Sequence, residues 1–266
     1  MKISIVTVAY NAAATIADTL CSVAAQSYPE VEHIVVDGDS KDATREVVAR
    51  HEGRVTHFLS EPDQGIYDAM NKGIALATGD VIGTLNADDL YVDSSVLAQV
   101  AKVFENPMVD ACYADLAYVD RANTRNVVRY WRSSDYRRGL FARGWCPPHP
   151  TFFARREIYE RCGTFDLGFH LAADFELMLR FLEIERIRVV YVPKVWVKMR
   201  LGGVTNKSPA NILQQNREIL LAATTHGLSF NLFIFVLGKM LNRASQFLKR
   251  GQVKFYTASI DEADKS

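Results

Sequence analysis

The chain has 266 residues, with 31 Lys and Arg balanced by 31 Asp and Glu, 48% hydrophobic residues and four cysteines. This length is enough for one large domain with a sizeable core, and the ordinary composition excludes collagen, disulfide scaffolds and wholesale disorder. The zero net charge hides an uneven distribution, because residues 1–120 carry 7 basic and 19 acidic residues and residues 121–266 carry 24 and 12. Such an asymmetry indicates two functions, or one site approached from two sides.

The cysteines are scattered, with no C-x-x-C pair and no histidine at metal-ligand spacing. Reduced thiols in a cytoplasmic protein are therefore expected, rather than disulfides or a zinc site. The first residues, MKISIVTVAYN, have too short an apolar run for a secretory signal and predict a first strand. No apolar stretch reaches the roughly 18 residues of a membrane-spanning helix.

The N-terminal part alternates strand-like and helix-like segments. Strands are expected at 3–8, 31–36, 55–59 and 80–85, and helices at 11–26, 41–51, 66–77 and 93–104. Helical crossovers of this length require a mostly parallel sheet, so the pattern predicts a Rossmann-like α/β fold. Ligands bind at the carboxyl ends of the strands in such sheets, where polar residues gather after the first, second and fourth predicted strands.

The alternation weakens after residue 110. Further strands are expected at 111–118, 126–131, 151–154 and 189–192, and helices at 157–162, 174–183 and 211–225. An Arg/Gly/Pro-rich segment at 137–150 and a Gly-rich one at 199–206 predict loops.

The strongest local signal is Asn86-Ala87-Asp88-Asp89, directly after an apolar strand. Adjacent carboxylates repel each other unless a cation or hydrogen bonds offset the repulsion, and Mg²⁺ or Mn²⁺ takes such oxygen ligands. The same two aspartates could instead cap the next helix, and the pair alone does not decide between these alternatives.

Two more segments carry candidate binding residues. Asp37, in Asp37-Gly38-Asp39-Ser40, could accept hydrogen bonds from a ribose or a base, or belong to a turn with a helix cap. Asp68 and Lys72 share one face of the helix predicted at 66–77, where they could form an ordinary surface ion pair. Neither a G-x-G-x-x-G nor a P-loop motif occurs, which argues against nicotinamide and Walker-type phosphate binding.

Four segments occur in a specific order: TVAYN, VDGDSKDAT, SEPDQGIYDAMNKG and ATGDVIGTLNADD. With this order the chain resembles a family 2 glycosyltransferase of the GT-A fold over about residues 1–205. It is most similar to bacterial enzymes that build exopolysaccharide or O-antigen units. The resemblance divides the chain into a donor-binding half (1–120), an acceptor-binding half of the same domain (121–210) and a C-terminal helical extension (211–266).

The resemblance also implies roles for particular residues. The nucleotide-sugar contacts would come from the first two strand ends, the helix at 66–77, the D-x-D position and a C-terminal loop that covers the donor: Thr7, Val8, Tyr10, Asp37, Asp68, Lys72, Asn86, Ala87 and Arg200. Because Asn86 replaces the first Asp of D-x-D, the metal role falls mainly on Asp88, with the role of Asp89 open. Mn²⁺ or Mg²⁺ is the implied cofactor.

On the acceptor side, Asp174 in Ala-Ala-Asp-Phe-Glu matches the position of the catalytic base. A carboxylate there would take the proton of the acceptor hydroxyl, although an Asp at a helix start can also be a simple cap. His149 matches a segment that contacts the diphosphate or the acceptor.

The function implied is inverting transfer of one sugar from a nucleotide-sugar, expected to be a UDP-sugar with GDP- and dTDP-sugars open. The acceptor would be a lipid-linked saccharide in cell-surface polysaccharide synthesis. The Gln-x-x-Arg-Trp element of processive synthases is absent. A sugar nucleotidyltransferase and a non-catalytic nucleotide- or sugar-binding protein are the alternatives, and Asn86 favours the second.

The segment 228–250 mixes aromatic, aliphatic and basic residues at helical spacing. It could lie peripherally on the inner face of an anionic membrane, pack on the catalytic core, or form a homodimer. The arginines are dispersed and no nucleic-acid-binding motif contains them, so no nucleic-acid partner is expected.

Overall fold

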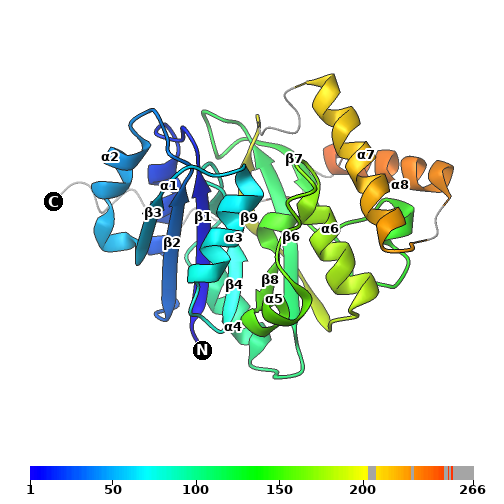
Figure 1. The fold of residues 1–266 in the computed structure, drawn as a ribbon, viewed down its shortest axis with the longest axis horizontal. Helices are drawn as coiled ribbons and strands as arrows, with labels where there is room; N and C mark the ends of the chain where they lie inside the picture. Colours follow the sequence, from blue (N-terminus) through cyan, green and yellow to red (C-terminus); the bar gives the residue numbers. More distant parts are fainter. Residues whose placement is uncertain (203–207, 229–230, 249–250, 252, 254–266) are drawn as a thin grey trace.

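The computed structural model describes residues 1–202, 208–228, 231–248, 251 and 253. Within these residues the chain forms one nine-stranded sheet with helices on both faces (Figure 1). The strands are β1 (Ile3–Ala9), β2 (Val31–Asp37), β3 (His57–Ser60), β4 (Val81–Thr84), β5 (Leu90–Tyr91), β6 (Ala111–Val119), β7 (Val127–Trp131), β8 (Phe153–Arg155) and β9 (Val189–Arg200).

The α-helices agree in order with those expected. They are α1 (Ile16–Ala24), α2 (Thr44–Ala49), α3 (Ile66–Leu76), α4 (Val96–Phe104), α5 (Arg156–Cys162), α6 (Ala173–Leu179), α7 (Pro209–Thr225) and α8 (Leu232–Leu248). Short 3₁₀ turns are η1 (Glu52–Arg54), η2 (Phe141–Arg143) and η3 (His149–Thr151), and α6 continues into a π-helical turn, η4 (Arg180–Ile184).

The strand order is β3-β2-β1-β4-β8-β6-β9-β5, with β7 paired to β6. The predicted α/β class is confirmed, and β3, β2, β1 and β4 are parallel, as is the pair β6–β9. The other four ladders are antiparallel, so the sheet is mixed rather than mostly parallel. Because β8 is antiparallel to both β4 and β6, these two strands point the same way.

This topology brings the carboxyl ends of six strands to one edge of the sheet: β1, β2, β3, β4, β6 and β9. Ala9 of β1 is in register with Asp37 of β2, which in turn pairs with Ser60 of β3. On the other side of β8, Val119 of β6 pairs with Arg200 of β9. The loops that leave this edge therefore bring together residues from both halves of the sequence.

The core lies on both faces of the sheet, since successive strand residues point to opposite sides. Val6 and Ile34 belong to a cluster that includes residues of α3, α5 and α6, whereas Ile5 packs in a cluster with α4. All of β1 is buried, in agreement with its sequence ISIVTVA, which is mainly β-branched. Each fully buried valine or isoleucine contributes about 1.5–3 kcal/mol of transfer free energy.

The C-terminal helices pack on this domain. Ser208 caps α7 by accepting a hydrogen bond from the Asn211 N–H at 3.2 Å, and Ile219 of α7 is in the core. Phe235 of α8 is only 4% exposed and lies in the same cluster. The packing alternative for the tail is thus observed for one face of α8.

The structure differs from the expectation at the end of the sheet. The strand expected at 189–192 extends to Arg200, because β9 pairs with β6 as far as Val119 and with the short strand β5. Pro193 and Lys194 interrupt its apolar pattern, and the register shifts beside Asp115. The loop expected at 199–206 therefore begins after Arg200, and its residues 203–207 lie outside the described part of the chain.

Candidate active site

Asp37 lies at the carboxyl end of β2 with both carboxylate oxygens engaged. Oδ2 accepts hydrogen bonds from the Ser40 N–H (3.1 Å) and the Ser60 hydroxyl (2.7 Å), and Oδ1 accepts one from the Ser40 hydroxyl. Asp37 is fully buried. The Asp63 carboxylate lies against the next residue, since a Cβ at Gly38 would be 2.2 Å from Asp63 Oδ2. The carboxylate is thus fixed in position, with Gly38 allowing the close approach of Asp63.

The residues at the end of β1 differ in orientation. Thr7 is buried, and its hydroxyl lies 2.9 Å from Nε2 of His33 inside the sheet, so its side chain points away from solvent. Val8 is also buried, at 6% exposure, whereas Tyr10 is 62% exposed just beyond the strand. Of the three, only Tyr10 presents its side chain where a planar base could stack. Nucleotide contacts from Thr7 and Val8 remain a prediction.

The helix α3 begins at the same edge, after the Gly65 turn (φ 116°). Asp68 accepts a hydrogen bond from the Gln64 N–H at 3.0 Å. Lys72 Nζ lies 2.8 Å from Glu61 Oε1 and 3.5 Å from Asp68 Oδ2, and this pairing raises the pKa of the lysine. Asp68 and Lys72 therefore hold the turn in shape, and Lys72 stays cationic.

The segment after β4 combines buried carbonyl and carboxylate oxygens. Asn86 donates from Nδ2 to Asp89 Oδ2 at 3.2 Å, and Ala87 between them is buried. Asp89 is fully buried, and burial together with the Asp88 charge raises its pKa well above the usual range. Asn86 Oδ1 and Asp89 Oδ1 are buried without a hydrogen-bond partner among the described residues.

Arg200 holds this segment from the end of β9. Its Nη1 donates to the Asp88 carbonyl oxygen at 3.0 Å, and its Nη2 pairs with the Asp18 carboxylate of α1. The side chain is only 6% exposed. Arg200 is therefore part of the sheet edge and packs beneath the Asp88 loop, and its contact with the donor remains a prediction.

The donors at this loop fit a hard divalent cation. Asp88 is partly exposed, and the two orphaned oxygens of Asn86 and Asp89 lie within one residue or two of it. No group of three His, Cys, Asp or Glu side chains in the described residues could hold a metal by itself. Mn²⁺ or Mg²⁺ would therefore bind through one or two carboxylates and complete its shell with phosphate oxygens and water.

Asp174 lies at the start of α6, facing α3. Its Oδ1 accepts hydrogen bonds from the Tyr67 hydroxyl (3.1 Å) and from the Phe175 N–H (2.9 Å). Burial, with the Asp174 charge, raises the pKa of Tyr67 well above its usual range, so the phenol remains a donor. Among the described residues no donor reaches Oδ2, which leaves this oxygen available for another proton.

His149 lies next to this carboxylate, in η3. Its Nε2 is 3.3 Å from the Thr84 hydroxyl at the end of β4, and its ring packs edge-on against Phe165 with centroids 5.5 Å apart. Burial lowers the pKa of His149, an effect that the Asp174 charge partly offsets. The imidazole is therefore neutral at pH 7 and bridges the Asp174 side of the site to the end of β4.

The sequence interpretation missed Tyr67, whose hydroxyl bonds to Asp174, and two further groups whose pKa values the Asp174 charge affects, Cys146 and Lys239. Tyr67 lies in the motif SEPDQGIYDAMNKG, directly before Asp68. This position was the only feature of the sequence that could have pointed to it. Cys146 and Lys239 come from distant segments: burial raises the pKa of the thiol, with further effects from Asp174 and then Lys239. No local pattern could have shown that α8, at Phe235 and Lys239, packs directly against Gly144.

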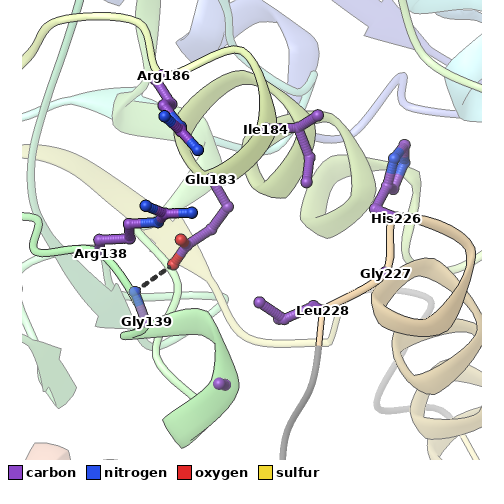
Figure 2. Close-up of a pocket in the computed structure, with 9 residues that line it drawn as sticks. Arg138, Gly139, Glu183, Ile184, Arg186, His226, Gly227 and Leu228 are labelled. Carbon is purple, nitrogen blue, oxygen red and sulfur yellow. Dashed lines mark hydrogen bonds between the residues drawn. The ribbon is translucent and has the colours of Figure 1, made fainter.

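A cavity of about 330 Å³ lies elsewhere, at the far end of the helix that begins with Asp174 (Figure 2). Arg138, Arg186, Glu183 and His226 are among its lining residues, and Glu183 Oε1 accepts a hydrogen bond from the Gly139 N–H at 2.7 Å, whereas His226 pairs with Glu176. Glu183 is nine residues beyond Asp174, so this cavity is separate from the strand ends.

Residues 4–163 match the family described as "Glycosyl transferase family 2". The chain is 31% identical over 207 residues to a PGL/p-HBAD biosynthesis glycosyltransferase of Mycobacterium tuberculosis, covering 76% of this chain and 78% of the relative. It is 33% identical over 181 residues to a second glycosyltransferase of that organism, which is described as uncharacterized, covering 67% and 68%. The chain therefore belongs to glycosyl transferase family 2.

Solved structures confirm the GT-A fold. S. aureus TarS 1-349 in complex with UDP-GlcNAc matches 94% of this chain and 72% of that chain, with a TM-score of 0.66 and 19% identity. A mannosyltransferase from Pyrobaculum calidifontis in complex with GDP-Man and Mn²⁺ matches 92% and 74%, with a TM-score of 0.61 and 20% identity. The chain spans 43% of the longer S. aureus TarS structure. Among the described residues, no helix has the length and apolar character needed to cross a bilayer.

Proposed function

We propose that this chain transfers a single sugar from a nucleotide-sugar, with a UDP-sugar as the first expectation, to an acceptor hydroxyl with inversion at the anomeric carbon. The observation that carries this proposal is the half-used carboxylate of Asp174, whose Oδ1 is held by two donors while Oδ2 is free of them among the described residues. Family membership and the nucleotide-sugars bound by the S. aureus and P. calidifontis structures support the donor class.

The donor would lie across the carboxyl ends of the strands. Tyr10 offers its exposed ring to the base. Asp37 is buried with both oxygens engaged by Ser40 and Ser60, so it would hold the loop after β2 in place beneath the nucleotide. Lys72 would contribute positive charge near the diphosphate by exchanging Glu61 or Asp68 for a phosphate oxygen as its partner. Rigid placement of these groups lowers the entropy lost when the donor is bound in a reactive geometry.

The reaction is a direct displacement. The acceptor oxygen forms a bond to the anomeric carbon as the bond from that carbon to the diphosphate oxygen breaks, and Asp174 Oδ2 takes the hydroxyl proton. Tyr67 keeps the carboxylate in place, and neutral His149 adds no competing charge. Asp88, with oxygens of Asn86 and Asp89, would hold Mn²⁺ or Mg²⁺, which when bound neutralises the charge of the leaving nucleoside diphosphate.

The acceptor class is the second part of the proposal. A lipid-linked saccharide in cell-surface polysaccharide synthesis is supported by the apolar residues that α8 exposes, among them Phe233 (75%), Met240 (65%) and Leu241 (61%). Of these residues, Phe233 and Leu241 project away from the packed Phe235, and their side of α8 could lie on the inner face of the plasma membrane. Sedimentation with and without anionic vesicles separates this peripheral association from a homodimer through the same face.

A donor panel tests the reaction. Wild-type protein should release nucleoside diphosphate from one sugar nucleotide in the presence of an acceptor extract and Mn²⁺, and less after metal removal. Asp174→Asn should bind the donor normally and lose about 10²–10⁴-fold in transfer. Glu157→Gln, an exposed acid on α5, is the control and should keep full activity.

Two results would contradict the proposal. Normal transfer by Asp174→Asn would show that another group takes the proton. Release of pyrophosphate from a nucleoside triphosphate and a sugar phosphate would identify a nucleotidyltransferase instead.

A further inference from the structure

Three basic side chains lie in the region where β7 packs against α8. Arg129 lies on β7 opposite Tyr118 of β6, and Lys239 and Arg243 follow one another by one turn of α8. None of the three forms an ion pair with a carboxylate anywhere in the described part of the chain. Three neighbouring cations without an acidic partner are costly to hold together, which indicates an anionic ligand.

Arg129 is the most constrained of these cations. It is 8% exposed, its guanidinium carbon lies 3.6 Å from the centroid of the Tyr118 ring, and the Phe247 ring is 5.8 Å away on α8. Its Nε has no hydrogen-bond partner within the part of the chain that the structure describes. Burial lowers the pKa of Arg129, and the positive charge of Arg243 lowers it further. A buried guanidinium with an unused donor is suited to an incoming phosphate oxygen.

Lys239 connects this cluster to the catalytic carboxylate. Its Nζ donates one hydrogen bond to Asn216 Oδ1 of α7 at 2.7 Å, and an ammonium has two further donors. Burial and the charge of Arg243 lower the pKa of Lys239, while Cys146 and Asp174 act in the opposite direction. The same helix α7 contacts the segment that precedes Asp174, because the Glu218 carboxylate accepts hydrogen bonds from the Leu171 and Ala172 N–H groups. An anion bound here would therefore lie on the side of the molecule where α6 begins.

An apolar groove begins at the same two residues of α8. The cavity between α7 and α8 has a volume of about 290 Å³, and both Lys239 and Arg243 line it. Its remaining walls are mainly aliphatic or aromatic: Ile212, Leu220, Leu232, Phe235, Val236 and Met240. A cationic end that continues into an apolar groove matches the chemistry of an amphiphile with a phosphorylated head.

The position of α8 is fixed by backbone contact. A Cβ at Gly238 would lie 2.0 Å from the Arg143 carbonyl oxygen, and one at Gly144 would lie 2.5 Å from the Phe235 carbonyl oxygen. The helix thus docks on the loop that follows η2 with no side chain between them. Lys239, the residue after Gly238, is held in a defined place and is not on a mobile tail.

We propose that Arg129, Lys239 and Arg243 bind the phosphate or diphosphate of the acceptor, and that the groove between α7 and α8 holds the first part of its apolar chain. This inference rests on the proposed function for the acceptor hydroxyl, but the phosphate site itself can be measured without turnover. A free sugar phosphate and a lipid phosphate both carry the charged head. Only the lipid phosphate also has an apolar chain that would occupy the groove.

Calorimetric titration of the full chain with farnesyl diphosphate and with inorganic diphosphate tests the site. EDTA is present throughout, so that metal-dependent diphosphate binding near Asp88 is suppressed. Arg243→Gln should weaken both probes about tenfold or more, since it removes a charge-assisted hydrogen bond. Lys102→Gln, an exposed lysine on α4, loses the same charge far from the cluster and should bind both probes as the wild type does.

The groove is tested separately by Val236→Asp, at a half-exposed wall position. It should weaken farnesyl diphosphate and leave inorganic diphosphate unchanged. Equal binding of the two probes by the wild type would overturn the lipid part, and wild-type binding by Arg243→Gln would overturn the phosphate site. If Arg243→Gln weakens binding to anionic vesicles but to neither soluble probe, the three cations bind the membrane surface instead of the acceptor phosphate.

The outcomes separate this inference from the proposed function. If no sugar nucleotide releases its diphosphate, yet farnesyl diphosphate binding depends on Arg243, the transferase proposal fails and the site stands. If transfer occurs and Arg243→Gln changes the affinity for neither probe, the transferase proposal stands and the phosphate site fails. Because Arg243 is exposed, its replacement leaves the fold intact, which a melting curve verifies.

Discussion

The hydroxyl of Tyr67 donates a hydrogen bond of 3.1 Å to Oδ1 of Asp174, across 107 residues of sequence. Tyr67 belongs to α3, which starts near the carboxyl ends of the parallel strands, and Asp174 is the second residue of α6. Stacking of Tyr67 on Phe165, with ring centroids 5.4 Å apart, fixes the phenol. The contact joins α3 to the start of α6 and holds one oxygen of the carboxylate in place.

Tyr67→Phe tests this positioning role. The ring and its stacking are kept while Asp174 loses one of its two donors, so kcat should fall about tenfold with the donor KM unchanged, and the protein should lose about 1 kcal/mol of stability. Steady-state kinetics and urea unfolding measure the two effects. Tyr159→Phe is the control, because Tyr159 is also buried but has no hydroxyl partner among the described residues. Equal kinetics for both variants would remove Tyr67 from the mechanism.

Much of the donor side could be predicted from the sequence because its residues follow short buried strands. The apolar runs that end at Ala9, Asp37 and Thr84 set both the strand ends and the edge where the polar residues lie. The orientation of individual side chains was beyond such a pattern. Thr7 and Tyr10 are three residues apart, yet one faces His33 in the interior and the other faces solvent.

The acceptor side was predicted less completely, since long-range packing determines it. The period of the residues in α8 did not distinguish core packing from membrane contact, because Phe235 packs in the core while its neighbours Phe233 and Val236 are exposed. The antiparallel strand β8 was recognised as a strand, but its place between β4 and β6 depends on pairing that no local pattern encodes.

Arg200→Met tests whether the Asp88 loop depends on β9. The substitution keeps the length and apolar contacts of the side chain but removes its bonds to the Asp88 carbonyl and the Asp18 carboxylate. We expect a loss of about 1–3 kcal/mol of stability, and a weaker apparent affinity for Mn²⁺ in the transfer assay, because Asp88 is less well placed.

Asp18→Asn is the matched control for Arg200. Asp18 is 59% exposed, so its pairing with Arg200 is screened by solvent and contributes little. This variant keeps the Arg200 bond to the Asp88 carbonyl and should retain the wild-type metal dependence. If the two variants have the same metal dependence, the Arg200–Asp88 contact does not support the metal site.

Gly238→Ala tests the docking of α8. Since a Cβ there would come within 2.0 Å of the Arg143 carbonyl oxygen, the helix and the loop must move apart. Overpacking of this kind costs about 1–3 kcal/mol, and the displacement of Lys239 should raise the acceptor KM while the donor KM stays constant. Thermal unfolding and kinetics measure these changes. Gly53→Ala, where a Cβ meets nothing within 4 Å, should behave as the wild type.

His33 predicts a pH dependence of stability. Burial lowers its pKa to about 4 in the folded chain, against an ordinary value of about 6.5 in the unfolded one. Between these values the unfolded state binds a proton that the folded state does not. The associated stability is therefore complete above about pH 6.5 and is lost as the pH falls towards 4, by roughly 3 kcal/mol in total.

Urea unfolding from pH 7.5 to pH 4.5 measures this slope. His33→Gln removes the titrating group while an amide can still bond to the Thr7 hydroxyl, so its stability should fall less steeply with acid than that of the wild type. Part of the slope should persist, because burial also lowers the pKa of His149. His170→Gln changes an exposed histidine and should keep the wild-type slope. Parallel curves for wild type and His33→Gln would show that His33 is not buried as a neutral ring beside Thr7.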